Sequence, residues 1–162
     1  MQNKNNKKGF TLLETLVVIA MVAIMTIAVL TTLNTNKLER ELETAGDQVY
    51  SAIRETQNYA LTGKEAEQGC DAYSFSFSGR EYAITNKVSG GDNCTFRSIG
   101  ELENNVAFAG SGEIEFTVPH GTVNVAGVMP IILSKEGRSY NVCVYGIGAV
   151  TRTRTTCSST PE

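Results

Sequence analysis

The residues with the clearest chemical potential lie near the start of the chain, where Lys7 and Lys8 precede Gly9, Phe10 and, four residues later, Glu14. A long apolar run follows Glu14. A carboxylate at the beginning of a membrane-length helix is costly unless a cation neutralises it. Cleavage of the chain after Gly9 would supply that cation, because the new α-amine of Phe10 on a neighbouring copy would pair with Glu14. The pattern favours a self-associating subunit over an enzyme.

The apolar run from Thr15 to Leu33 contains 19 residues and no charge. As an α-helix it would measure about 28 Å, close to the ~30 Å hydrocarbon core of a bilayer. The lysines precede this run, which predicts that the N-terminal end stays cytoplasmic and the remainder lies outside the membrane. A secretory signal peptide is the alternative, but the run is longer than the apolar core of such a peptide and ends in TTLNTNK, without a small-residue cleavage site.

Length and charge limit the remaining possibilities. With 162 residues, the chain has room for one modest globular domain beside the apolar run. The formal net charge is -3, and removal of the three lysines in residues 1–9 makes it -6. A chain this acidic has no overall attraction to nucleic acid, which leaves only a local basic patch for such a role.

Four cysteines, Cys70, Cys94, Cys143 and Cys157, all follow the apolar run. An even number in a domain predicted to be exported favours disulfides. Metal binding is disfavoured, because the chain has no CxxC pair and His120 is its one histidine. Among the three connectivities we favour the sequence-local pairs, Cys70 with Cys94 and Cys143 with Cys157, each stabilising by about 3 kcal/mol on the chain-entropy model. We expect neither a metal nor a cofactor.

The hydrophobic period stays helical beyond the apolar run. Mostly apolar residues recur in steps of three and four, which marks one face of an amphipathic helix. These are Leu38, Leu42, Ala45, Val49, Ala52, Ile53, Thr56 and Tyr59. The charged residues fall mostly on the other side: Lys37, Glu39, Arg40, Glu41, Glu43 and Asp47. Gly46 weakens the helix by up to ~1 kcal/mol relative to alanine and permits a bend, and Gly63 is the expected stop.

From about Ala72 the hydrophobic period changes to two. Tyr73, Phe75 and Phe77 alternate with serines, and similar alternation recurs as far as Thr156, with glycine-rich turns between the runs. The pattern predicts an antiparallel sheet. Its apolar face is expected to pack on the amphipathic face of helix 37–60, which makes the fold α+β.

The segment KKGFTLLE at residues 7–14 resembles the class III signal sequence of type IV prepilins and type II secretion pseudopilins. That signal is a short basic leader, a glycine and a phenylalanine that opens a run such as FTLLE. The resemblance implies that a prepilin peptidase in the bacterial inner membrane cuts between Gly9 and Phe10 and methylates the new amine. It also implies a pilin-like lollipop shape and, as partners, other pilins or pseudopilins in a filament.

On this resemblance the chain is expected to have four parts. These are a cleaved basic leader (1–9), a transmembrane or filament-core helix (10–33), an amphipathic continuation (34–62) and a β-rich head (63–162). The precursor would cross the inner membrane once, with its N-terminus cytoplasmic and its head periplasmic or extracellular. The expected function is structural: a minor pilin or pseudopilin of a type IV pilus or a type II secretion pseudopilus.

Residues near the C-terminus suggest a subgroup and an alternative function. The segment 148–154, GAVTRTR, together with the segment EREL at residues 39–42, loosely resembles the GspH/FimT-like minor pilins. Arg152 and Arg154 lie two apart on a predicted strand and so project from one face. They suggest a DNA-uptake pilin whose arginines hold phosphates. The simpler interpretation is a solvated strand face whose charges discourage edge aggregation. An ordinary single-pass membrane protein with a periplasmic domain is a third possibility.

Overall fold

The computed structural model describes residues 12–63, 69–88 and 93–160, without the side chains of 27–35, 93, 95 and 96. The expected leader 1–9 and the expected cleavage junction between Gly9 and Phe10 therefore lie outside the described residues. The chain divides into two compact units, Met1–Leu38 and Glu39–Glu162. The helix α1 (Leu12–Thr62) contributes to both units.

Helix α1 ends where the sequence predicts. Gly63 adopts a φ of +63°, a left-handed conformation that glycine reaches without steric cost. Its N–H donates to the carbonyl of Tyr59 at 2.9 Å and closes the last turn. No proline interrupts the described helix, and Gly46 is its one glycine.

Within the described part of the chain, no helix combines the length and the hydropathy needed to cross a membrane. The transmembrane expectation for residues 10–33 is thus not confirmed. Residues 10 and 11, and the side chains of 27–33, lie outside the description.

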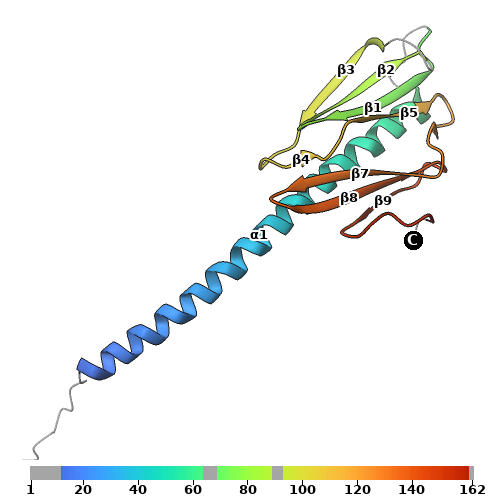
Figure 1. The fold of residues 1–162 in the computed structure, drawn as a ribbon. Coiled ribbons are helices and arrows are strands. Elements are labelled where there is room, and N and C mark those ends of the chain that lie inside the picture. Colours follow the sequence, from blue (N-terminus) through green and yellow to red (C-terminus); the bar gives the residue numbers. More distant parts are fainter. Residues whose placement is uncertain (1–11, 64–68, 89–92, 161–162) are drawn as a thin grey trace, which may run out of the picture. The chain divides into compact units, whose positions relative to one another are not determined.

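The strands of the second unit form two antiparallel sheets, where the sequence predicted one. The first sheet has the order β3-β2-β1-β5-β6, and the second has the order β4-β7-β8-β9 (Figure 1). The strands are β1 (Ala72–Ser78), β2 (Glu81–Lys87), β3 (Asn93–Glu101), β4 (Ala107–Phe108), β5 (Gly112–Thr117), β6 (Thr122–Val123), β7 (Val128–Lys135), β8 (Arg138–Tyr145) and β9 (Val150–Thr153). All strand pairs are antiparallel, as predicted.

Both sheets share one hydrophobic core with the C-terminal half of α1, which runs beside them in Figure 1. The helix side of this core confirms the predicted apolar face from Leu42 onward, and Ala60 extends it. Aromatic residues of β1 occupy the centre, where Phe75 and Tyr73 are fully buried. The helix residues are Leu42, Ala45, Val49, Ala52, Ile53 and Ala60. The amphipathic face is therefore what joins the helix to the sheets.

Candidate functional site

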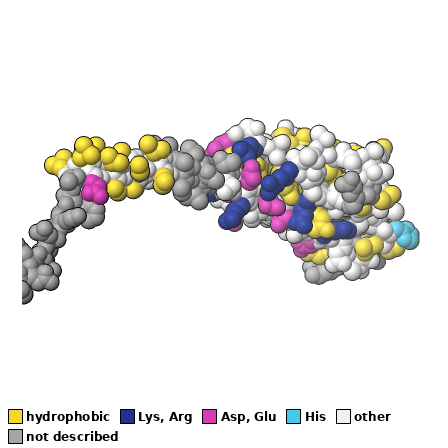
Figure 2. Space-filling view, turned by 90° about the horizontal axis from the view of Figure 1, so that it is seen from below, with side chains coloured by type: hydrophobic (Ala, Val, Ile, Leu, Met, Phe, Trp, Pro, Cys, Tyr) yellow, Lys and Arg dark blue, Asp and Glu magenta, His cyan; other side chains and the backbone are white. Residues whose placement is uncertain are grey.

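The first half of α1 presents an almost wholly apolar surface. Every described side chain from Leu12 to Thr26 is exposed, and the large hydrophobic ones are between 43% and 82% exposed. The hydroxyls of Thr15 and Thr26 donate to the carbonyls of Leu12 and Val22, at 2.9 and 2.8 Å, so even these polar groups are satisfied within the helix. Figure 2 shows the hydrophobic side chains gathered along this segment.

Glu14 is the one charged residue between Leu12 and Thr26. It lies in the first described turn of α1, and its side chain is exposed. A carboxylate in this position interacts favourably with the partial positive charge at a helix N-terminus. The exposed acid thus lies near one end of an apolar helix surface.

Residues 4–30 match the family model of the prokaryotic N-terminal methylation motif. The chain has a type IV prepilin-like N-terminus. No curated protein and no solved structure matches the chain. The motif supports a prepilin or pseudopilin, and nothing supports the GspH/FimT-like subgroup that the segment 148–154 suggested.

The head of this prepilin-like chain contains two disulfides, Cys70–Cys94 and Cys143–Cys157. These are the sequence-local pairs that the sequence favoured. Strand β9 is only four residues long. The disulfide Cys143–Cys157 joins β8 to the segment that follows β9. It therefore holds the C-terminal segment at the edge of the second sheet.

Arg152 and Arg154 are exposed, but their guanidinium groups contact helix α1. Arg154 is 3.4 Å from a carboxylate oxygen of Glu39 and 3.4 Å from one of Glu43. Arg152 forms an ion pair with Asp47, and its guanidinium lies 4.7 Å from the centre of the Tyr50 ring, within cation–π range. Both arginines therefore hold the edge strand β9 and its continuation to the helix.

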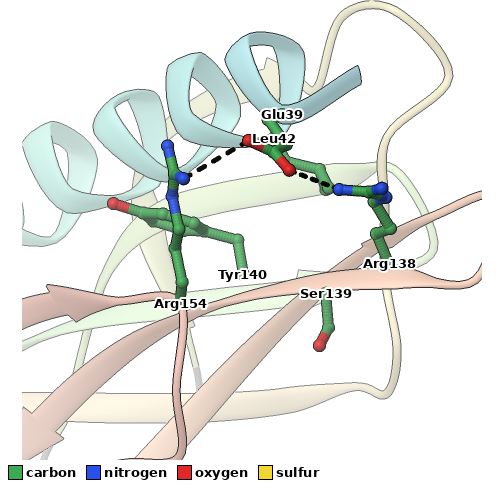
Figure 3. Close-up of a pocket in the computed structure, with 6 residues that line it drawn as sticks. All are labelled: Glu39, Leu42, Arg138, Ser139, Tyr140 and Arg154. Carbon is green, nitrogen blue, oxygen red and sulfur yellow. Dashed lines mark hydrogen bonds and ion pairs between the residues drawn. The ribbon is translucent and has the colours of Figure 1, made fainter. Parts of the chain in front are cut away.

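Arg138 completes this ion-pair cluster, which we define as Glu39, Glu43 and Asp47 of α1 with Arg138, Arg152 and Arg154 of the second sheet and its C-terminal extension. In Figure 3, Arg138 and Arg154 approach the Glu39 carboxylate from opposite sides, with Leu42 and Tyr140 close by. A shallow pocket of about 250 Å³ lies among these residues and Ser139.

The ion-pair cluster bears on the predicted DNA-binding role of Arg152 and Arg154. Three carboxylates face three guanidinium groups, so the cluster carries no excess positive charge. A phosphate backbone binds to groups that can neutralise it. The DNA-uptake alternative consequently gains no support from the placement of these arginines. The simpler interpretation, a solvated strand face whose charges discourage edge aggregation, is also incomplete. The side chains of both arginines reach helix α1 and form ion pairs there.

Tyr140 packs beside the ion-pair cluster, and the charges of Glu43 and Arg154 affect the pKa of its phenol. Burial raises the pKa of the Tyr140 phenol above its usual value of 10.0, and the negative charge of Glu43 raises it further. The positive charge of Arg154 acts in the opposite direction and lowers the pKa. The ring also lies against Gly46: a β-carbon at that position would collide with it.

Other sequence candidates lie apart from these residues. His120 is exposed in the turn after β5. In the described ranges, no three side chains among His, Cys, Asp and Glu are grouped to hold a metal ion.

Sequence reasoning missed the helix carboxylates of the cluster. It placed Glu39, Glu43 and Asp47 on the solvent side of α1, although their spacing of four residues aligns them on one stripe. That alignment was a usable signal, but the sequence did not reveal which strand would face the stripe. Reasoning also missed Lys87, whose side chain is only 10% exposed and lies 3.1 Å from Glu113 and 3.7 Å from Glu115.

Proposed function

We propose that this protein is a minor pilin or pseudopilin, a structural subunit of a type IV pilus or type II secretion pseudopilus. Residues 1–9 serve as the leader, and a prepilin peptidase cleaves between Gly9 and Phe10 and methylates the new amine. Segment 10–33 holds the precursor in the inner membrane and then enters the filament core. Segment 34–62 and the head 63–162 form the outer part of the filament, periplasmic or extracellular.

The methylation motif at residues 4–30 is the observation that carries this proposal. The apolar surface of α1 from Leu12 to Thr26 supports the proposal as well. Covering such a surface with lipid or with other helices removes it from water and lowers the free energy. Glu14 also supports the proposal. In a core of packed apolar helices, its carboxylate would need a cation, and the α-amine of Phe10 on a neighbouring subunit has the required charge.

The leader assignment is tested by replacing Gly9 with leucine in the full-length chain, expressed with its cognate peptidase. We expect the product to stay unprocessed and to be heavier by residues 1–9, because a peptidase that reads glycine cannot accommodate the larger side chain. Intact-mass spectrometry measures this. Asn6→Leu, in the same leader, is the matched control and is expected to be processed. Normal cleavage of the Gly9→Leu variant would refute the leader assignment.

The role of Glu14 is tested separately from cleavage. Glu14→Gln removes the charge and keeps the shape, so we expect a processed, methylated subunit whose incorporation into filaments is strongly reduced. Thr15→Val, the neighbouring position, is the control and should assemble normally. Quantitative immunoblotting of sheared filaments measures incorporation. Equal incorporation of the Glu14→Gln variant and the wild type would exclude the pairing.

A further inference from the structure

The longest open strand edge of the head belongs to β3. The two sheets have four edge strands, and β6, β4 and β9 contain only two, two and four residues. Strand β3 contains nine residues. Proteins usually shorten, cover or charge such an edge, since its unpaired backbone groups are a template for another strand. Strand β3 is thus the place in the described head where a further strand would add.

The backbone groups that face outward from β3 follow from its pairing with β2. The N–H of Leu102 donates to the carbonyl of Arg80 at 2.8 Å, and Glu101 lies opposite Glu81 in the next position of the ladder. Because hydrogen-bonded and non-hydrogen-bonded pairs alternate in antiparallel sheets, the N–H and C=O groups of residues 97, 99 and 101 point away from β2. One outward group already has a partner within the chain: the carbonyl of Glu101 accepts from the Gln48 amide at 3.0 Å, which agrees with this direction. A carbonyl oxygen has two lone pairs, so the second one can accept from a further strand.

The side chains of the same three residues form a self-complementary pattern. Arg97, Ile99 and Glu101 project from one face of β3, all are exposed, and Ile99 is 60% exposed. When two copies of this strand pair antiparallel about Ile99, the two Ile99 residues lie opposite each other. Arg97 of each copy then lies opposite Glu101 of the other, on both sides of the isoleucine pair.

Among the registers centred on Arg97, Ile99 or Glu101, the one centred on Ile99 joins unlike charges and the other two join like charges. Centring the pair on Arg97 would oppose two arginines, and centring it on Glu101 would oppose two glutamates, both unfavourable. The isolated copy also has Glu101 directly opposite Glu81. Arg80, 3.1 Å from Glu101, offsets that like-charge pair in part. A second copy's Arg97 would add a positive charge there.

We propose that two copies of the chain associate through their β3 edges, antiparallel and centred on Ile99, to form a continuous sheet across a two-fold axis. The contact is isologous, whereas successive subunits of a helical filament meet through heterologous contacts. It therefore joins free copies or, if the proposed function holds, copies in separate filaments. The contact is small and weak, because only residues 97–101 of each strand take part.

A cysteine scan of the full-length chain in mild detergent tests the register. The Cα atoms of a directly opposed hydrogen-bonded pair lie about 5.5 Å apart, a separation that a disulfide spans. Ile99→Cys is expected to give a disulfide-linked dimer under mild oxidation. Ser98→Cys, also exposed, is the matched control: it lies opposite Gly100 of the partner copy and projects from the other face, so it should not cross-link. Equal cross-linking at both positions would mean contact by collision or through the apolar helices, and would overturn the proposal.

A charge exchange in the Ile99→Cys background tests the complementarity. Arg97→Glu and Glu101→Arg are each expected to lower the dimer yield about threefold to tenfold, because each creates two like-charge contacts. A mixture of the two variants should restore the yield as a heterodimer, and so should the double variant alone. Dimer yields that stay the same in all of these variants would also overturn the proposal. Processing at Gly9 is read from the same samples by mass, so failure of this contact and failure of the proposed function are distinguishable.

Discussion

The two ends of helix α1 handle apolar side chains in opposite ways. Between Leu12 and Thr26, every described side chain is exposed, and the large hydrophobic residues cover the surface on all sides. Between Glu39 and Thr62, most of the apolar residues form one stripe that is buried against two sheets, and Leu61 remains exposed. The charged residues of this second stretch include the three that pair with arginines of the second sheet.

The difference separates two sources of stability within one helix. Burial of apolar surface stabilises by roughly 25 cal/mol per Å². The second stretch gains this from the chain itself, so it belongs to the folding unit of the head. The first stretch keeps its apolar surface exposed, so its stabilisation depends on what covers it from outside the chain. Substitutions in the first stretch should affect assembly, and substitutions in the second should affect folding.

One matched pair of substitutions tests this comparison most directly. Ile53 is fully buried and Ile19 is 69% exposed, and both lie on α1. Ile53→Ala is expected to lower the free energy of unfolding by about 2–5 kcal/mol through lost burial and a new cavity. Ile19→Ala should change it by only about 0.5 kcal/mol or less. Chemical denaturation followed by near-ultraviolet circular dichroism of the tyrosines in the head measures both.

Filament incorporation supplies the converse measurement. Ile19→Ala is expected to reduce incorporation of a subunit whose head remains as stable as the wild type. If Ile19→Ala destabilised the head as much as Ile53→Ala, the two stretches would form one folding unit and the comparison would fail.

The same contrast explains what the sequence could predict. The helix, its apolar face and its end at Gly63 follow from local periodicity and one conformational requirement, which are properties of neighbouring residues. The two disulfides also join cysteines that are close in the sequence. The division of the strands into two sheets depends instead on long-range pairing. Alternation identifies a strand but not its partner, so β4 and β7 could not be assigned to a separate sheet.

The candidate sites show a similar limit. The methylation motif is contiguous in the sequence and was predicted in full, whereas the ion-pair cluster joins residues about a hundred positions apart, such as Glu39 and Arg138. The sequence showed the arginine pair and the stripe of carboxylates separately. Only the packing of β9 beside the helix brings them together, and this turned a suspected phosphate site into a contact within the head.

Gly46 offers a second test of how tightly the buried half of α1 packs. Gly46→Ala should improve helix propensity by about 1 kcal/mol. A β-carbon at this position meets the buried Tyr140 ring, however, and overpacking typically costs about 1–3 kcal/mol. We therefore expect a net loss of stability in thermal unfolding. Thr44→Ala, at an exposed position two residues away, is the control and should be neutral or stabilising.

Shortening the facing side chain separates the two effects. In a Tyr140→Leu background the ring is absent, so Gly46→Ala should become stabilising. A substitution that is equally harmful in both backgrounds would show that Gly46 serves as a bend in the helix, as the sequence suggested, and not as space for the ring.

The smallest expected effect concerns the charges over Tyr140, and it tests whether the ion-pair cluster is formed in solution. The pKa of Tyr140 is raised in the folded state, first by burial and then by Glu43, so the folded chain favours the neutral phenol. The unfolded chain releases this proton at a lower pH. The resulting stability is complete below pH 10.0 and is lost as the pH rises through the folded-state pKa. Tyr140→Phe should remove this part of the alkaline loss.

Arg154 provides the decisive variant, because its positive charge lowers the pKa of Tyr140. Arg154→Ala should raise that pKa further, while the free energy of unfolding near neutral pH changes by no more than about 1 kcal/mol, as is usual for exposed ion pairs. Ultraviolet difference titration of each variant against its Tyr140→Phe counterpart isolates the one phenol. Ser139→Ala, beside Tyr140 and without charge, is the control. An unchanged Tyr140 pKa in the Arg154→Ala variant would place the guanidinium away from the helix in solution. The arginines would then again be available to a phosphate. The ion pairs would also no longer support the contrast between the two stretches of the helix.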